Sequence, residues 1–270
     1  MRIRLKFFLF LVGCITGMNC FGQGKKTEFN KIHAKDTARL EIIYMHDALD
    51  VKKDDWRESK EMLLIGDSIR VYQGYGNYQL DSIKAKKLPF EKYLDLSRQY
   101  KPLNESLTID KKNGIMNFYG SIFINYYVYS EPIPEFEWTL TEETDTIMGH
   151  ECFKATTNWR GRDWEAWYSD IPIDAGPWKF QGLPGLILKI EDTEGVHSIY
   201  AIGLKKEPIR IGRAKADHNK TTRKKYLDAL EDHAENAWKN YENSSMVKLN
   251  DDQKKEVGKR RLFNSPIELE

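Results

Sequence analysis

Ser68 stands in a pattern that could supply a nucleophile. It follows an apolar run and a Gly-Asp pair in Leu63-Leu64-Ile65-Gly66-Asp67-Ser68-Ile69. A serine hydroxyl becomes nucleophilic when a histidine removes its proton and an acid orients that histidine. None of the six histidines has an aspartate three residues before it, and His197, with Glu194, comes closest. The activating pair that Ser68 would need is therefore not visible in the sequence.

The same stretch resembles the first block of the Gly-Asp-Ser hydrolases, whose histidine and aspartate share a late Asp-x-x-His block. This chain lacks that block. The residues around Gly66-Asp67 also read as two strands joined by a turn, and not as a strand-to-helix turn. A serine hydrolase at Ser68 is thus the least favoured alternative. We assign no catalytic residue and expect that the protein is not an enzyme.

Metal and carboxylate chemistry also lack a complete set of groups. His150 and Cys152 would share one face of a strand, but a structural metal site takes about four ligands and no second pair is visible. Glu142, Glu143 and Asp145 are close in sequence, with nothing that places them across a cleft. No glycine-rich phosphate loop is present. We expect no metal and no cofactor.

Aromatic residues carry more information than the titratable ones. Several fall in and around one expected hairpin and could line an apolar binding site; the competing interpretation is that they fill a core. The candidate ligand-binding residues are Trp159, Trp164, Trp167, Trp178 and Phe180.

An unusual loop follows these aromatics. From Trp167 to Leu188, Gly-Pro and Pro-Gly pairs bracket aromatic residues, which excludes a regular helix or a central strand and favours one rigid conformation. The hexapeptide Gly182-Leu183-Pro184-Gly185-Leu186-Ile187, with Gly176-Pro177 upstream, resembles the motif of the GLPGLI family of exported cell-envelope proteins. The terminal Asn264-Ser-Pro-Ile-Glu-Leu269 also fits this family, although Ser265 separates Asn264 from Pro266. The resemblance implies an envelope location and supplies no catalytic residue.

Residues 1–22 have the three parts of a secretory signal peptide: a basic start, an uncharged run and small residues before a cleavage site after Gly22. The alternative is a lipoprotein anchored through Cys14, although its apolar segment would be short. Either way we expect an exported protein of the periplasm or cell envelope. No later stretch is long and apolar enough to span a membrane.

The predicted domains are a flexible segment, 23–36, and a single β-rich domain, 37–270, with a helical C-terminal part. The formal net charge of +1 falls to about −2 once Arg2, Arg4 and Lys6 are removed, so a nucleic acid is not an expected partner. Residues 205–225 contain nine lysines and arginines and only two acids. This basic segment is either a solvent-exposed face or a contact surface for an acidic partner. The sequence does not specify an oligomeric state.

Closely spaced strands with short turns predict an α+β fold with an antiparallel, strongly curved sheet and C-terminal helices. Helices are expected at 90–100 and 222–240, with a second charged helix over 251–263. Strands are expected at 40–44, 60–66, 68–73, 136–140, 144–148, 151–159, 163–169, 186–190 and 196–204, and one long or two short strands at 115–129. An open half-barrel is one form of this sheet, and it resembles the periplasmic lipoprotein carriers.

These features favour a non-enzymatic envelope protein that binds or carries a hydrophobic ligand or a lipidated partner. The alternative is a docking module for an outer-membrane receptor system, which would use the loop 174–184 and the basic segment 205–225. A carrier should contain a cavity, whereas a docking module should have a filled core and an exposed apolar patch.

Overall fold

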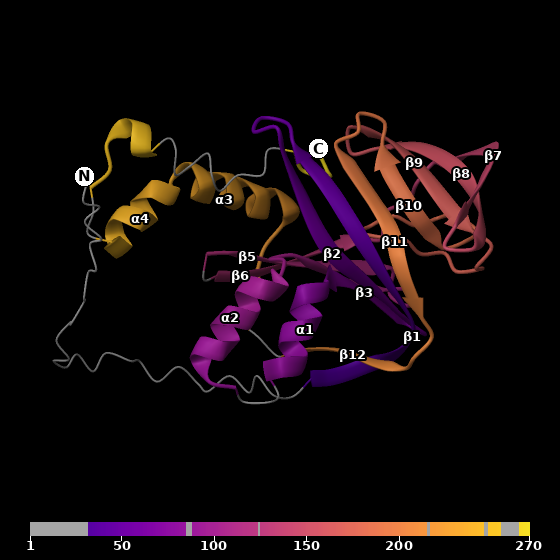
Figure 1. Ribbon diagram of the computed structural model, residues 1–270, viewed down its shortest axis with the longest axis horizontal. Helices are drawn as coiled ribbons and strands as arrows, with labels where there is room; N and C mark the ends of the chain where they lie inside the picture. Colours follow the sequence, from indigo (N-terminus) through magenta and orange to yellow (C-terminus); the bar gives the residue numbers. More distant parts are fainter. Residues whose placement is uncertain (1–31, 85–87, 124, 215–216, 246–247, 255–264) are drawn as a thin grey trace, which may run out of the picture.

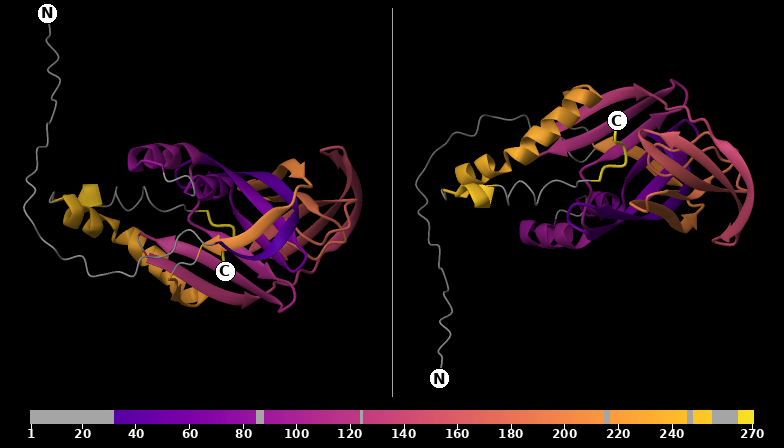
Figure 2. Two further views of the ribbon diagram at one scale, coloured as in Figure 1. Left: turned by 90° about the horizontal axis from the view of Figure 1, so that it is seen from below. Right: turned by 90° about the horizontal axis from the view of Figure 1, so that it is seen from above.

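A computed structural model of the protein describes residues 32–84, 88–123, 125–214, 217–245, 248–254 and 265–270. The predicted signal peptide lies outside these residues. Within them, thirteen strands form one sheet in the order β13-β6-β5-β4-β3-β2-β1-β11-β10-β9-β8-β7, with β12 also paired to β1. Figure 1 and Figure 2 show that this sheet is strongly curved and that its two end strands do not meet. The predicted fold class, an α+β fold with a curved antiparallel sheet, is confirmed.

The strands are β1 (Ile32–Asp50), β2 (Asp55–Gly66), β3 (Ile69–Gly74), β4 (Ser106–Asp110), β5 (Ile115–Ile122), β6 (Asn125–Pro132), β7 (Thr139–Ile147), β8 (His150–Trp159), β9 (Arg162–Ser169), β10 (Ile187–Asp192), β11 (His197–Lys205), β12 (Ile209–Ala214) and β13 (Asn219–Lys220). The helices are α1 (Tyr75–Lys84), α2 (Phe90–Tyr100), α3 (Arg223–Glu235) and α4 (Ala237–Ser245). Paired strands are antiparallel except β13 and β6.

The predicted hairpins β2–β3, β8–β9 and β10–β11 are present, because each has a local turn signal. Arg160 and Gly161 both have positive φ between β8 and β9, as a tight two-residue turn requires. Residues 115–129 form two strands, β5 and β6. The predicted strand at 136–140 is wrong for 136–138: β7 begins at Thr139, and Trp138 instead donates a hydrogen bond to the backbone oxygen of Gln181 (2.7 Å).

The central strands are buried on both faces. Leu63 and Ile65 of β2 belong to the main core, whereas Met62 and Leu64 belong to a smaller core with Ile211 of β12. Successive residues of a strand point to opposite faces, so this continuous burial needs cover on both sides. The second face lies against residues of α1 and β12.

The helices follow the predictions in part. α2 has the predicted bounds, and α3 begins after Thr222, whose hydroxyl accepts a hydrogen bond from the Lys225 amide. Asn236 then separates α3 from α4, so the predicted helix 222–240 is divided. The predicted second helix, 251–263, begins as expected, but beyond residue 254 it lies outside the described residues. None of the helices in the described ranges is long and apolar enough to cross a membrane.

Four elements had no predicted counterpart, namely α1, β4, β12 and β13, and β1 was predicted only at 40–44. In α1, Asn77 exchanges two 2.8 Å hydrogen bonds with the Leu103 backbone, and Gly76 lies against the Tyr100 carbonyl. β1 begins at Ile32 and pairs with β12 from Ile32 to Ala38. Residues 32–36, predicted as flexible, are therefore strand, because partners far along the chain hold them.

The loop between β9 and β10 carries the hexapeptide motif and packs into the core. Ala175, Phe180, Leu183 and Leu186 are all buried. A Cβ on Gly185 would collide with the backbone oxygen of Ser169, whose amide donates to the Leu186 oxygen (2.8 Å). The glycine is thus needed where the loop returns to the sheet, and the apolar side chains of the loop face inward.

We expect Gly185→Ala to destabilise the protein by roughly 3 kcal/mol or more, because the new methyl group must displace backbone. Gly203→Ala is the matched control, since its Cβ would meet only Ile43 at 3.7 Å. Urea unfolding of both variants measures the difference. Equal stability of the two would contradict the close approach at Gly185.

Candidate functional site

A cavity of about 960 Å³ lies within the described part of the chain, on the side of the sheet that faces α3. Its walls come from β1, β2, β3, β5, β6 and β11, from the segment 103–105 before β4, from α3, from the β9–β10 loop and from the C-terminal segment, residues 265–270. A volume of this size is in the range of small-molecule binding sites. The residues that line it include His46, Ser59, Glu61, Tyr72, Glu105, Phe118, Ile122, Phe123, Tyr129, Trp178, His197, Arg223, Tyr226, Leu227, Leu230, Ala234, Pro266 and Glu268.

Phe118 of β5 is the centre of an aromatic cluster in the cavity wall. Its ring centroid lies 4.6 Å from that of Tyr129, 5.1 Å from that of Tyr226 and 6.2 Å from that of Trp178. The contacts with Tyr226 and Trp178 are edge-to-face, the geometry that aromatic quadrupoles favour. Gly120 leaves room for Tyr226, because a Cβ there would collide with its ring. The cluster is therefore a tightly packed apolar part of the cavity wall.

The β9–β10 loop places Trp178 in this wall. Trp178 has a φ of 51°, and the amide of Phe180 donates to the Pro177 oxygen at 3.1 Å, which closes a tight turn around it. Its indole N–H donates to Glu268 (3.0 Å). The ring orientation is thus fixed from both the loop and the C-terminal segment.

Glu268 joins three parts of the chain beside the cavity. Besides Trp178, its carboxylate contacts Lys179 at 2.7 Å and Arg223 of α3 at 3.0 Å. Lys179 is fully buried and also lies 3.4 Å from Glu131. A buried ammonium needs such partners, because an uncompensated charge in the interior is costly. The C-terminal segment is therefore part of the site.

Glu61 of β2 is the hub of a buried polar network at another wall of the cavity. His46 Nδ1 (3.0 Å), the Ser59 hydroxyl (2.7 Å) and the Tyr72 hydroxyl all hydrogen-bond to its carboxylate. Burial alone would raise the pKa of Glu61, but the charge and hydrogen bond of His46, with those of Tyr72 and Ser59, hold it below the ordinary value. Glu61 is therefore a carboxylate at neutral pH.

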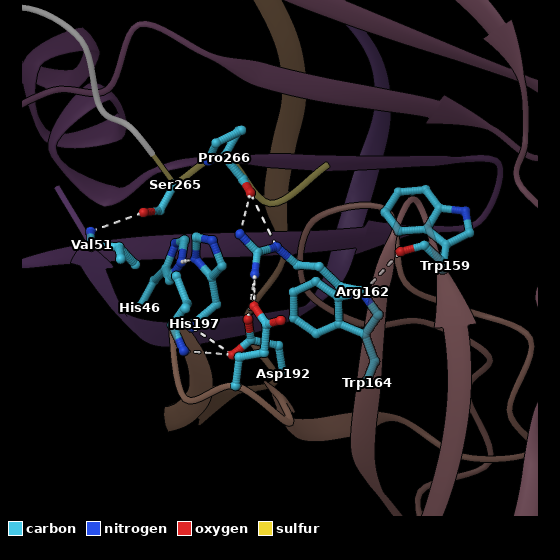
Figure 3. A network of polar contacts seen from close by, with 11 residues as sticks. His46, Val51, Trp159, Arg162, Trp164, Asp192, His197, Ser265 and Pro266 are labelled. Atoms are coloured by element: carbon cyan, nitrogen blue, oxygen red, sulfur yellow. Dashed lines mark hydrogen bonds and ion pairs between the residues drawn. The ribbon is translucent and has the colours of Figure 1, made fainter. Parts of the chain in front are cut away.

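The network continues from His46 to His197 of β11, with 3.1 Å between Nε2 and Nδ1 (Figure 3). Burial, and then the charges of His46 and Arg162, lower the pKa of His197 to about 3, so this imidazole is neutral. Arg162 lies 2.7 Å from Asp192 and donates to the Pro266 oxygen at 3.0 Å. This ion pair thus also holds the C-terminal segment in place.

Glu105 differs from these paired acids. It lines the cavity just before β4, and in the part of the chain that the structure describes no hydrogen bond or ion pair joins it to another residue. Burial, and then the charge of Glu268, raises its pKa to about 7, against the opposing effect of Lys179. Glu105 therefore changes its charge near neutral pH inside the cavity.

Only one of the predicted ligand-binding aromatics, Trp178, is among the lining residues. Trp164 and Phe180 are fully buried, with centroids 4.8 Å apart, and Trp159 packs on Phe180 at 5.4 Å. Trp167 lies on β9, with the Lys154 ammonium 5.8 Å from its ring. A role in ligand binding stays a prediction for all of them, but these four lie away from the described cavity.

The structure also describes the residues considered above for catalysis and metal binding. Ser68 is exposed in the β2–β3 turn, where its amide donates to Asp36 (2.7 Å). His150 contacts Asp170 at 3.0 Å, and Cys152 is buried. No group of three or more histidine, cysteine or acidic side chains suited to a metal occurs among the described residues. The acids that line the cavity include Glu61, Glu105 and Glu268. Their positions in the sequence follow no pattern that would have predicted a shared site.

A family model described as N-glycanase peptide, N-terminal domain, matches residues 96–232, half of the chain. The chain belongs to this family. The match includes the β9–β10 loop and most of α3, and so two walls of the cavity. Membership of the GLPGLI family stays a prediction.

Solved structures show a related fold. Two structures of PNGF-II, in space groups C2 and P21, are each 20% identical to the chain with a TM-score of 0.50, and cover 72% of it. The chain spans about a third of the length of PNGF-II (32% and 33%). A weak likeness links it to an outer-membrane lipoprotein-sorting domain from Vibrio parahaemolyticus (10% identity, 62% of this chain and 84% of that one, TM-score 0.18). A search of curated proteins found no match.

Glu105 gives the site a testable pH dependence. An unfolded glutamate loses its proton near the ordinary pKa of 4.5, whereas folded Glu105 keeps it to about 7. The folded state thus binds more protons between these values, and its stability falls as the pH rises through them. We expect Glu105→Gln to gain about 3 kcal/mol relative to the wild type between pH 4.5 and pH 8.

Chemical unfolding of both proteins at several pH values measures this change. Glu137→Gln removes an exposed acid and serves as the control, with no such pH dependence expected. A stability difference between Glu105→Gln and wild type that is constant with pH would contradict the raised pKa.

Proposed function

We propose that the protein binds an apolar or amphipathic ligand in its cavity and acts without catalysis, as an exported protein of the cell envelope. The observation that supports this most is the cavity itself, whose wall holds the Phe118 cluster. The rings pack on one another as in a core, and the same rings line a space between the sheet and α3. An apolar ligand in that space would lie against the cluster.

The exposed rim of the cavity fits this proposal. Phe123, in the β5–β6 turn, is 62% exposed, and Leu227 on α3 is 40% exposed, and both belong to the lining. Exposed apolar residues at the entrance of an apolar cavity provide a surface on which a ligand loses water before it enters. Ile122 and Leu230 continue the apolar lining further in.

The docking alternative has less support. In the loop 174–184 the apolar side chains point inward, and the exposed positions are Asp174, Gly182 and Pro184. Such a surface lacks the exposed apolar anchors that protein interfaces favour. The basic segment 205–225 remains a candidate contact for an acidic partner.

A second candidate ligand is a glycan. The family name refers to an N-glycanase, and the cavity combines aromatic rings with carboxylates, groups that can pack on a sugar and accept its hydroxyl protons. The chain spans about a third of PNGF-II, so the glycan is proposed here as a bound ligand and the activity of that protein is not carried over. An oligosaccharide tested beside an apolar probe distinguishes the two ligands.

Cavity filling tests the proposal. Leu230→Trp should lower the affinity for the neutral probe N-phenyl-1-naphthylamine by roughly tenfold or more, since the larger side chain takes up ligand space. Glu231→Trp, exposed on the same helix and outside the lining, should leave the affinity unchanged. Probe fluorescence measures binding, and circular dichroism verifies folding.

Native mass spectrometry of the exported protein, followed by denaturing extraction, looks for a natural ligand. Absence of probe binding to the wild type, together with a clean apo mass, would contradict the proposal. Equal affinities of the two tryptophan variants would place the binding site elsewhere.

A further inference from the structure

The unpaired acid of the cavity points to the charge of the ligand. Four acids line it: Glu58 is exposed to solvent, Glu61 has His46 as a partner, and Glu268 has Lys179 and Arg223. Glu105 has neither a hydrogen bond nor an ion pair with any described residue. Its side chain is partly buried and lines the cavity, so its carboxyl group faces the space that a ligand would occupy. A ligand that displaces water from this carboxyl group must supply a polar or charged partner in its place.

Glu105 lies close to the aromatic cluster. The next residue, Ser106, pairs with Tyr119 of β5, and Gly120 of the same strand lies against the Tyr226 ring. In keeping with this placement, the charge of Glu105 contributes to the raised pKa values of Tyr226 and Tyr129. Both rings contact Phe118, which contacts Trp178. Four aromatic residues and one carboxyl group thus line the same part of the cavity.

This combination is selective for a cation. The faces of aromatic rings attract ammonium groups, and the attraction is stronger when the cation leaves water. A carboxylate beside the rings adds a direct charge partner. The nearby bases do not compete with a ligand, since Lys179 and Arg223 are already held by Glu268.

We propose that the Glu105 side of the cavity binds the ammonium group of an amphipathic cation, with the apolar chain of the ligand along the lining of Phe118, Ile122 and Leu230. This inference rests on the proposed function and narrows its ligand class to alkylammonium compounds.

Binding of such a cation must depend on pH. Only ionised Glu105 attracts it, so affinity rises as Glu105 loses its proton around pH 7, the value to which burial raises its pKa. The groups that act on this titration come from several elements. They are Glu268 of the C-terminal segment, Lys179 of the β9–β10 loop and Glu61 of β2. The other titratable or charged side chains that line the same cavity are His46, Arg57, Glu58, Tyr72, Tyr129, His197, Arg223, Tyr226 and His233.

Displacement of N-phenyl-1-naphthylamine tests the proposal on the full mature protein. The competitors are dodecyltrimethylammonium, dodecanol and dodecyl sulfate, each below its micelle concentration. The quaternary ammonium keeps its charge at every pH, so any pH dependence belongs to the protein. The wild type should bind it roughly tenfold more tightly than dodecanol at pH 8, with little preference at pH 5.5.

Glu105→Gln should retain the neutral probe and lose both the preference for the cation and its pH dependence. Glu137→Gln should behave as the wild type. The proposal is overturned if Glu105→Gln keeps the preference, or if the wild type binds the probe yet prefers dodecyl sulfate or shows no preference. If the wild type binds neither probe nor cation by calorimetry, the proposed function fails as well, so the two failures are distinguishable.

Discussion

Glu268 makes the contact on which the arrangement of the cavity depends. Its carboxylate is shared by Trp178 and Lys179 of the β9–β10 loop and by Arg223 at the start of α3. A strongly curved sheet leaves its concave side open unless other elements cover it, and α3 has few buried residues of its own, Tyr226 and Ala234. The ion pairs of Glu268 therefore hold α3 against the rest of the protein, a role that a broad apolar interface would otherwise have. They fix the helix, the loop and the C-terminal segment around a space that is not filled.

Several charged side chains are buried around this space, and most of them form ion pairs. Arg162 with Asp192, and His46 with Glu61, lie between the sheet and the C-terminal segment. A buried pair gains little net stability over an apolar pair, but removal of one partner is costly. These pairs are thus better understood as fixing positions than as adding stability. Among the described residues Glu105 stands out against this pattern, since Glu61 and Glu268 each have a base and the fourth lining acid, Glu58, is exposed.

The sequence predicted what local signals determine. The hairpins follow turn residues such as Arg160-Gly161, and the bounds of α2 follow its apolar spacing. Long-range contacts determined the rest. Residues 32–36 are strand only because β12 lies beside them, and α1 forms with the help of Leu103. The cavity belongs to this second class, because Glu61, Glu105 and Glu268 come from three segments with no spacing that would relate them.

The aromatic residues show why composition alone does not separate a core from a binding site. Trp164 and Trp178 are both large rings close to the motif loop, yet one is fully buried and the other lines the cavity. Trp164 lies on β9, where Phe180 stands opposite it and fills the space. Trp178 instead contacts Phe118 and Tyr72 and lines the cavity. The role of a ring thus depends on what the fold places across from it and not on the residue type.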